Sequence, residues 1–403
     1  METARPHVSI IADAPTPRLA YACQVVFGRL LGWGYRVRAL SEAGSGPEDG
    51  PVLFYTQAPG PFGLHLRPHG LLSASGTEPV GNLAALEQDL LAAVFWLCTH
   101  YAAYSPTHPV DAHGRPLPAY LPGLTDPEVP ACHVLAARLA AALGQQGAPA
   151  RPLEVIHTVD VDNAYAYRGK GPWRWWGGLA KDVLAGKARH VYRRLGAAMG
   201  LLADPYDNHA RLLGSLHGPG KTVFFLMASH GRYDKAIAHS HPLFAALVAR
   251  YQQAGWRVGL HPSYGGGQNA QAIRQEAKAL APHTQDAITQ TRHHYLRWKI
   301  PHTPRLVAEL GFTDDYSPGP VVPGFWQGIS VPFLWYDVER DEVSGLTLHP
   351  AAWMDVHWAM RPAEGIATLQ RLWAALKPFG GQLVLIWHND YFSVFQSYVG
   401  QLK

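Results

Sequence analysis

From residue 153 onward, short runs rich in β-branched and apolar residues alternate with longer segments whose apolar residues recur at helical spacing. Strands separated by helices of about 10–15 residues predict a mostly parallel α/β sheet or a (β/α) barrel. This alternation constrains the fold more than any other feature of the chain. The predicted strands are 153–161, 222–229, 256–261, the short 330–338 and 382–390.

The first part of the chain shows a second α/β pattern, followed by a Pro-rich irregular stretch over 105–130. The sequence GQQGAPARP at 144–152 is typical of a linker. We therefore predict an N-terminal α/β domain over 1–148 and a barrel domain over 149–403. The N-terminal strands are predicted at 7–13, 35–40 and 52–56, and the helices at 18–32, 82–104 and 133–143.

Composition excludes several classes of protein. The net charge of +4 over 403 residues is small for a dedicated nucleic-acid binder. Three cysteines without CxxC spacing fit a reducing compartment. The N-terminus lacks an export-signal pattern, and the longest apolar run, Leu90 to Cys98, is shorter than the ~20 residues of a membrane span. We expect a cytoplasmic protein without an integral membrane segment, and leave its oligomeric state open.

Polar side chains stand at the ends of three predicted strands. Asp160 and Asp162 end the first strand, His261 ends the third and His388 lies near the end of the last. The carboxyl ends of parallel strands meet at one edge of a sheet, where α/β folds bind their ligands. We therefore expect these four residues to converge on one site.

Each of these candidate residues, and also Arg292, has two interpretations. Asp160 and Asp162 share a strand face, which favours a cation and a general base, or they are solvated caps of the next turn. His261 suits a first-row metal ion or a hydrogen-bonded loop position. Arg292 would orient the base or join a surface salt-bridge patch. His388 is a candidate general acid or a satisfied core histidine.

Six short motifs, in order, resemble the polysaccharide deacetylase family, in a bacterial branch with an extra N-terminal α/β domain. The resemblance spans roughly 153–392 and implies a distorted (β/α) barrel. It also implies metal-dependent hydrolysis of an N-acetyl group on a sugar or glycan. The motifs are Asp-x-Asp at 160–162, Gly-Leu-His-Pro-Ser at 259–263, Arg-x-His-Tyr at 292–295, Asp-Tyr-Ser at 315–317, Gly-Phe-x-x-Gly at 324–328 and Trp-His-Asn at 387–389.

The resemblance implies a metal centre and a base. Asp162 and His261 match metal-binding residues of the family, and Asp160 matches the catalytic base. The implied metal is a divalent ion, zinc first, with cobalt, manganese and nickel as alternatives. The implied partner is a carbohydrate or sugar-conjugate substrate rather than a nucleic acid.

The resemblance also implies the residues around the base and the substrate. Arg292 matches the arginine that positions the base, and Asp315 corresponds to its acidic partner. His388 matches the general acid. The aromatic residues expected to stack against the sugar are Tyr264, Tyr295 and Trp326.

One departure from the family pattern concerns the metal centre. The second motif normally carries another histidine four residues after the first, and here that position is Gly265. His294, His230 and His157 are open as substitutes. The departure also keeps an alternative function open, in which an impaired deacetylase-like barrel binds a glycan or a protein partner.

A basic and aromatic segment at 168–196 stands outside these motifs. It interleaves Lys and Arg with Trp173, Trp175 and Trp176. Such a segment binds an anionic polymer or a membrane surface, or it packs on the domain as an amphipathic excursion with solvated basic residues. The second interpretation is the more common one.

Overall fold

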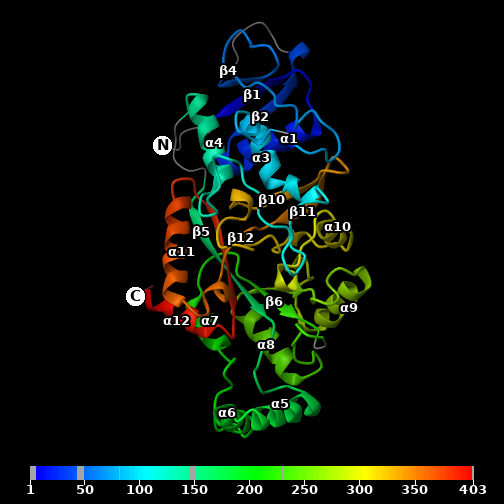
Figure 1. The fold of residues 1–403 in the computed structure, drawn as a ribbon, viewed down its shortest axis with the longest axis vertical. Coiled ribbons are helices and arrows are strands. Elements are labelled where there is room, and N and C mark those ends of the chain that lie inside the picture. The colour runs from blue at the N-terminus through cyan, green and yellow to red at the C-terminus, as the bar shows by residue number, and fades with distance from the viewer. Residues whose placement is uncertain (1–5, 43–49, 81, 146–150, 229–230, 402–403) are drawn as a thin grey trace.

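Two separate β-sheets, one after the other along the chain, organise the fold (Figure 1). In Figure 1 the N-terminal sheet and its helices lie at the top, and the second sheet occupies the middle. The predicted mixed α/β architecture is confirmed. The computed structural model describes residues 6–42, 50–80, 82–145, 151–228 and 231–401. The predicted boundary at residue 148 lies outside the described residues.

The N-terminal sheet has the strand order β2-β1-β3-β4, and all its pairings are parallel. The strand β1 lies between β2 and β3, and five of its six residues are buried. Its strands are β1 (His7–Ala12), β2 (Gly34–Ala39), β3 (Val52–Tyr55) and β4 (Leu64–His65). The helices beside it are α1 (Pro17–Cys23), a π-helical turn at Gln24–Leu31, α2 (Leu83–Leu86), α3 (Leu90–Cys98) and α4 (Ala131–Ala142).

The second sheet has nine strands in the order β10-β11-β9-β8-β7-β6-β5-β13-β12. Every pairing is parallel except that of β10 with β11. The predicted parallel α/β sheet is confirmed, while the pairings of the described strands leave β10 and β12 as its two ends. The strands are β5 (Leu153–Val161), β6 (Thr222–Leu226), β7 (Arg257–His261), β8 (Gln290–Thr291), β9 (Asp314–Asp315), β10 (Phe333–Asp337), β11 (Glu342–Leu348), β12 (Ala351–Met354) and β13 (Gly381–His388).

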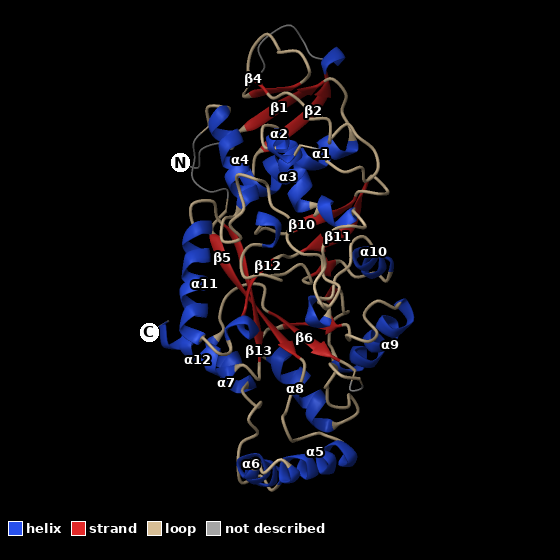
Figure 2. Cartoon of the chain, in the orientation of Figure 1, coloured by secondary structure: helices blue, strands red, loops and turns tan. Residues whose placement is uncertain are grey.

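Helices connect most of these strands and pack beside the sheet (Figure 2). One pair, α5 and α6, departs from this arrangement and lies at the bottom of the molecule in Figures 1 and 2. The helices of this part are α5 (Pro172–Leu184), α6 (Ala188–Ala198), α7 (His209–Ser215), α8 (Pro242–Gln253), α9 (Ala270–Leu280), α10 (His302–Glu309), α11 (Pro362–Leu376) and α12 (Phe392–Gln401).

The helix predicted over 82–104 is broken in the structure. Asp89 caps a new helix there, because its Oδ1 accepts a hydrogen bond from the amide of Ala92 at 3.1 Å. Its Oδ2 accepts from the hydroxyl of Tyr55 at 2.6 Å and from the amide of His69 at 2.9 Å. The apolar spacing predicts helical structure correctly, but a buried carboxylate with these partners starts a helix rather than continuing one.

The hydrophobic core is continuous between the two sheets. The hydroxyl of Tyr21 on α1 donates to the carbonyl of Leu334 on β10 at 2.7 Å. Arg18 is fully buried, and its Nε pairs with Asp341 Oδ1 at 2.7 Å. A buried guanidinium requires a partner of this kind, so α1 is fixed to the β10–β11 hairpin.

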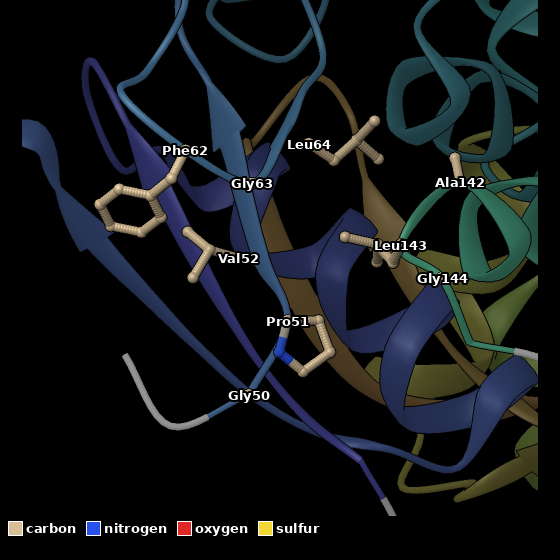
Figure 3. A pocket seen from close by; sticks show the side chains of 9 residues that line it. All are labelled: Gly50, Pro51, Val52, Phe62, Gly63, Leu64, Ala142, Leu143 and Gly144. Carbon is tan, nitrogen blue, oxygen red and sulfur yellow. The ribbon is translucent and has the colours of Figure 1, made fainter. Parts of the chain in front are cut away.

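A pocket at the N-terminal sheet lies between β3, β4 and the end of α4 (Figure 3). Its lining is glycine, proline and apolar side chains, including Val52, Phe62 and Leu143. None of the described residues that line it is ionisable, so we place no chemistry there. No described helix is both long enough and apolar enough to span a lipid bilayer.

Candidate metal centre and active site

The ends of β5, β7 and β13 in the second sheet bring the predicted polar residues together. His388 on β13 is paired with Asp160 on β5, and β6 separates β5 from His261 on β7. Asp160 Oδ2 lies 4.0 Å from both His261 Nε2 and His388 Nε2. The parallel register therefore places these side chains at one edge, as the strand ends indicate.

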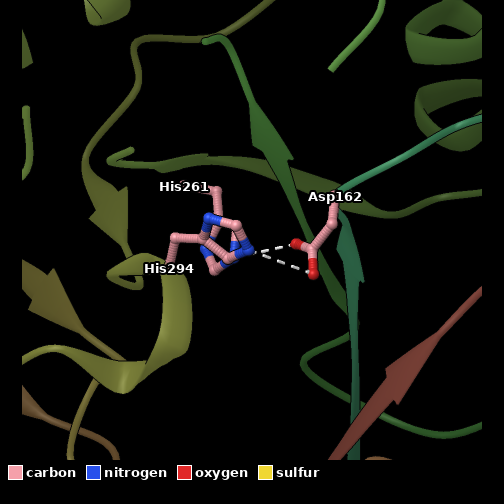
Figure 4. Close-up of side chains that lie close together, drawn as sticks. All are labelled: Asp162, His261 and His294. Carbon is pink, nitrogen blue, oxygen red and sulfur yellow. Dashed lines mark ion pairs between the residues drawn. The ribbon is translucent and has the colours of Figure 1, made fainter. Parts of the chain in front are cut away.

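Asp162, His261 and His294 form a compact group of three potential metal ligands (Figure 4). Asp162 Oδ1 lies 3.1 Å from His261 Nε2, and Asp162 Oδ2 lies 3.3 Å from His294 Nε2. The Oδ1 atom of Asp162 is buried, yet it has no hydrogen-bond partner among the described residues. Two imidazoles and a carboxylate suit first-row divalent metals, and ligands that face a common ion need not bond one another.

The far nitrogens of both imidazoles are already occupied. The Nδ1–H of His261 donates to the carbonyl of Arg292, and the Nδ1–H of His294 donates to Asp234 Oδ1 at 2.9 Å. Asp234 in turn accepts from the amides of Tyr264 at 2.9 Å and Gly265 at 3.1 Å. These bonds leave the Nε2 atoms of both histidines facing Asp162, which is the arrangement found around metal-binding histidines. The residues present fit a divalent cation.

Charge supports the same interpretation. Burial raises the pKa of Asp162, but the charge of His294 and the contacts with His261 outweigh burial and hold this pKa well below its usual range. Burial lowers the pKa of His294, but Asp162 and Asp234 outweigh it and raise this pKa to about 9, so a metal ion would displace the Nε2 proton of His294 on binding. Asp162 is thus an anion in this environment, as a carboxylate ligand must be.

Asp160 is held by a buried arginine. Arg292 Nη1 donates to Asp160 Oδ1 at 2.8 Å and to the hydroxyl of Thr158 at 2.8 Å, while Nε donates to the carbonyl of Tyr316 at 3.0 Å. The guanidinium also lies over the Phe224 ring. These contacts fix one oxygen of Asp160 and leave Oδ2 facing His261 and His388.

His388 is oriented by Asp355. The Nδ1–H and the backbone amide of His388 each donate to an Asp355 oxygen at 2.6 Å, so Nε2 faces Asp160. Burial lowers the pKa of His388, but the charges of Asp355, Asp162 and Asp160 outweigh it and raise this pKa to about 10. A protonated imidazole at this position can donate its Nε2 proton.

Asp315 lies behind Arg292 with its oxygens engaged elsewhere. Oδ2 accepts from the indole N–H of Trp298 at 2.8 Å, and Oδ1 accepts from the hydroxyl of Ser317 at 2.5 Å. Burial raises the pKa of Asp315 to about 6, and the charge of Arg292 opposes this shift. Among the described residues, the ion pair of Arg292 is with Asp160 rather than with Asp315.

Two of the three aromatic residues expected to contact substrate lie beside His294. The rings of Tyr264 and Tyr295 have centroids 5.4 Å apart, and Tyr295 lies 4.8 Å from the His294 ring. Tyr233 joins them, 4.3 Å from Tyr264. His113 of the N-terminal part completes the group, its ring 4.8 Å from that of Tyr295.

The third aromatic residue, Trp326, lies in a different environment. It is buried and packs against Trp298 at 5.7 Å, His100 at 5.7 Å and Phe333 at 6.4 Å between ring centroids. These contacts are those of a core residue. None of the contacts among the described residues joins Trp326 to the metal ligands.

The three substitutes considered for the missing histidine differ in their surroundings. His294 joins the ligand group. His157 accepts the indole N–H of Trp387 at 3.1 Å within the core, and His230 lies outside the described residues. Sequence reasoning missed Asp234 and Asp355. Asp355 directly follows the apolar strand β12, so the strand-end pattern could have found it, whereas Asp234 is a loop residue without such a signal.

The solved structures that match include polysaccharide deacetylases, two of them candidates, and a family 4 carbohydrate esterase. They include a candidate polysaccharide deacetylase from Mycobacterium smegmatis, with 16% identity, 64% of this chain and 88% of that chain covered, and a TM-score of 0.40. A candidate deacetylase involved in O-antigen biosynthesis from Bordetella bronchiseptica has 16% identity, coverage of 58% and 71%, and a TM-score of 0.31.

A family 4 carbohydrate esterase from Streptomyces lividans, in complex with acetate, has 12% identity, coverage of 62% and 87%, and a TM-score of 0.30. With TM-scores of at most 0.40, these likenesses do not assign a function to this chain. No protein-family model matches the chain, and no curated protein is similar to it in sequence.

We expect Asp234→Ala to weaken metal binding by about 10- to 100-fold, because His294 would lose the partner that orients it. Competition with a zinc chelator measures this affinity in the purified protein. Asp314→Ala is the matched control, since Asp314 also pairs with a histidine, His349, at 2.7 Å. Equal losses in both variants would contradict a supporting role for Asp234.

Proposed function

We propose that this chain is a metal-dependent hydrolase that removes an N-acetyl group from a sugar or glycan, as polysaccharide deacetylases do. The observation that carries the proposal is the meeting of Asp162, His261 and His294 with Asp160 and His388 at one sheet edge. We also propose that the nine-stranded sheet forms a distorted (β/α) barrel. Zinc is the first candidate for the ion, with cobalt, manganese and nickel as alternatives.

In the proposed reaction three ligands would hold the ion, one residue would act as the base and another as the acid. A divalent ion held by Asp162, His261 and His294 would act as a Lewis acid toward the acetyl carbonyl. Arg292 fixes Oδ1 of Asp160, so Oδ2 is left to accept a proton from the attacking water. His388, held by Asp355, would donate its Nε2 proton to the nitrogen of the leaving amine. Asp160 and His388 thus take the base and acid roles.

The substrate class is supported by the aromatic residues next to the ligands. Tyr233, Tyr264 and Tyr295 come from three different loops and gather beside His294. Aromatic side chains with a few directed polar groups are typical of pockets that bind small organic ligands. A sugar ring that packs on one of these tyrosines would bring its N-acetyl group toward the ion.

The alternative, a barrel that only binds a glycan or a partner, rests on Gly265. The position of His294 weakens this alternative, because it offers a second imidazole next to Asp162 and His261. Elemental analysis separates the two functions. A protein that takes up no stoichiometric zinc, cobalt or manganese would favour the binding function.

The direct test is the release of acetate from N-acetylglucosamine oligomers by the full chain. We expect activity in the metal-loaded protein, a loss of about 100-fold or more after dialysis against a chelator, and recovery when zinc, cobalt or manganese is returned. Acetate measured by an enzyme-coupled assay gives the rate. A rate that is the same before and after metal removal would contradict the proposal.

A further inference from the structure

The helical pair α5 and α6 presents large apolar side chains to solvent. Trp173 is 90% exposed, Leu184 is 89% exposed and Leu201 is 73% exposed. The other exposed apolar residues of this segment are Trp176, Val183, Tyr192, Leu195 and Met199. In Figures 1 and 2 the pair lies at the end of the molecule opposite the N-terminal sheet. The expectation that this segment packs against the domain is therefore not met for these side chains.

These apolar residues lie on one face of each helix. In α5, Trp173, Trp176 and Val183 are spaced by three and seven residues, which places them on the same side. In α6, Tyr192 and Leu195 follow the same spacing, and Met199 continues it. The apolar face of a surface helix normally packs on a core. Here this face is the exposed one.

The same segment is strongly basic. Residues 168–201 contain eight Lys or Arg and one Asp, whereas the whole chain has a net charge of +4. The acid, Asp182, is buried and paired with Arg194. The exposed basic side chains are Arg174, Lys181, Lys187, Arg189 and Arg193.

A buried ion pair holds the two helices together without using the apolar face. Arg194 Nη2 and Nε donate to Asp182 Oδ2 at 2.7 and 3.2 Å, and the guanidinium lies 4.7 Å from the centroid of the Tyr167 ring. Arg174 Nη1 donates to the carbonyl of Ala236 at 3.1 Å. The pair is therefore tied to the loop that carries Asp234, at the same sheet edge as the metal ligands.

We propose that α5 and α6 dock the protein on the surface of an anionic lipid membrane. Tryptophan and leucine on one helix face, with Lys and Arg beside them, match the interfacial helices that lie in the headgroup region. The positive charge is complementary to an anionic surface. An anionic polymer would pair with the basic side chains but would leave the apolar face of the two helices exposed to water. The docking goes beyond the proposed hydrolysis and does not require it.

Binding to lipid vesicles tests this proposal with the full chain. We expect wild-type protein to sediment with vesicles of phosphatidylcholine containing a quarter phosphatidylglycerol, and not with pure phosphatidylcholine. Trp173→Ser with Leu184→Ser should abolish sedimentation. Replacing Lys187, Arg189 and Arg193 with Gln should weaken it on the order of a hundredfold. Met360→Ser is the matched control, because Met360 is 92% exposed outside the pair.

Several outcomes would overturn the proposal. These are no binding to anionic vesicles, equal binding by the Trp173/Leu184 variant, or binding to heparin without binding to vesicles. Dimerisation that the same variant abolishes, without vesicle binding, would instead assign the face to a second copy of the chain. Asp162→Ala should bind vesicles as wild type does, so failure of docking and failure of the hydrolase proposal are distinguishable.

Discussion

Protein carrying Asp162→Ala, His261→Ala or His294→Ala should be purified with far less than one equivalent of metal and should release acetate only at background rate. Each change removes one of the three proposed ligands, whose candidate donor atoms all lie within 4.8 Å of one another. The loss should exceed the roughly 10- to 100-fold expected for a residue that only supports a ligand. Elemental analysis and the acetate assay measure the two effects on the same samples.

The His294 variant is the most informative of the three, since family resemblance does not assign His294 to the metal. Gly265→Ala serves as its control. An added Cβ would meet Asp234 Oδ2 at 3.6 Å, an ordinary contact, and the amide that donates to Asp234 would remain. Full metal content in His294→Ala would show that His294 is not the third ligand.

Asp160→Asn and His388→Gln should each lower kcat by about 10²- to 10⁴-fold while the metal content stays near that of wild type. The reason is that neither residue belongs to the ligand group, yet Oδ2 of Asp160 and Nε2 of His388 lie 4.0 Å apart beside it. Steady-state kinetics on metal-loaded protein, with metal content determined in parallel, measures the effect.

His302→Gln is the control for these variants, because His302 is a histidine on α10, outside the site. It should keep wild-type kcat and metal content. If Asp160→Asn or His388→Gln turned over substrate as fast as this control, the base and acid assignments would be refuted. Loss of metal in either variant would indicate that the replaced residue is itself a metal ligand.

The strand ends made much of the site predictable. Asp160, Asp162, His261 and His388 all follow or end apolar runs, and a parallel sheet aligns such positions at one edge. This inference needs only the order of strands and helices. It places residues without any knowledge of loops.

His294 and Asp234 could not be placed in this way. The backbone after β8 turns through two consecutive non-glycine residues with positive φ, Tyr295 at 62° and Leu296 at 50°. Such conformations are uncommon and leave no mark in the local sequence. His294 directly precedes this turn and lies 3.3 Å from Asp162, and the loop after β6 places Asp234 2.9 Å from His294.

Several of the 22 histidines lie in the core rather than at the candidate site. Burial lowers the pKa of His100 and His133 to about 3 and that of His209 to about 4, so these imidazoles are neutral core residues. His209 shows how they are accommodated. Its two ring nitrogens meet the hydroxyl of Tyr251 at 3.1 Å and the carbonyl of Ala164 at 3.0 Å. Composition alone could not separate them from ligands.

The ion pair between Arg18 and Asp341 affects how the two sheets unfold. Separation of the N-terminal sheet would remove the carboxylate partner of the Arg18 guanidinium and would uncover apolar surface on the β10–β11 hairpin. We therefore expect the two sheets to share one melting transition rather than two, which calorimetry would measure. A substitution far from the metal ligands, at Tyr21 for example, would lower the folded population of both halves at once.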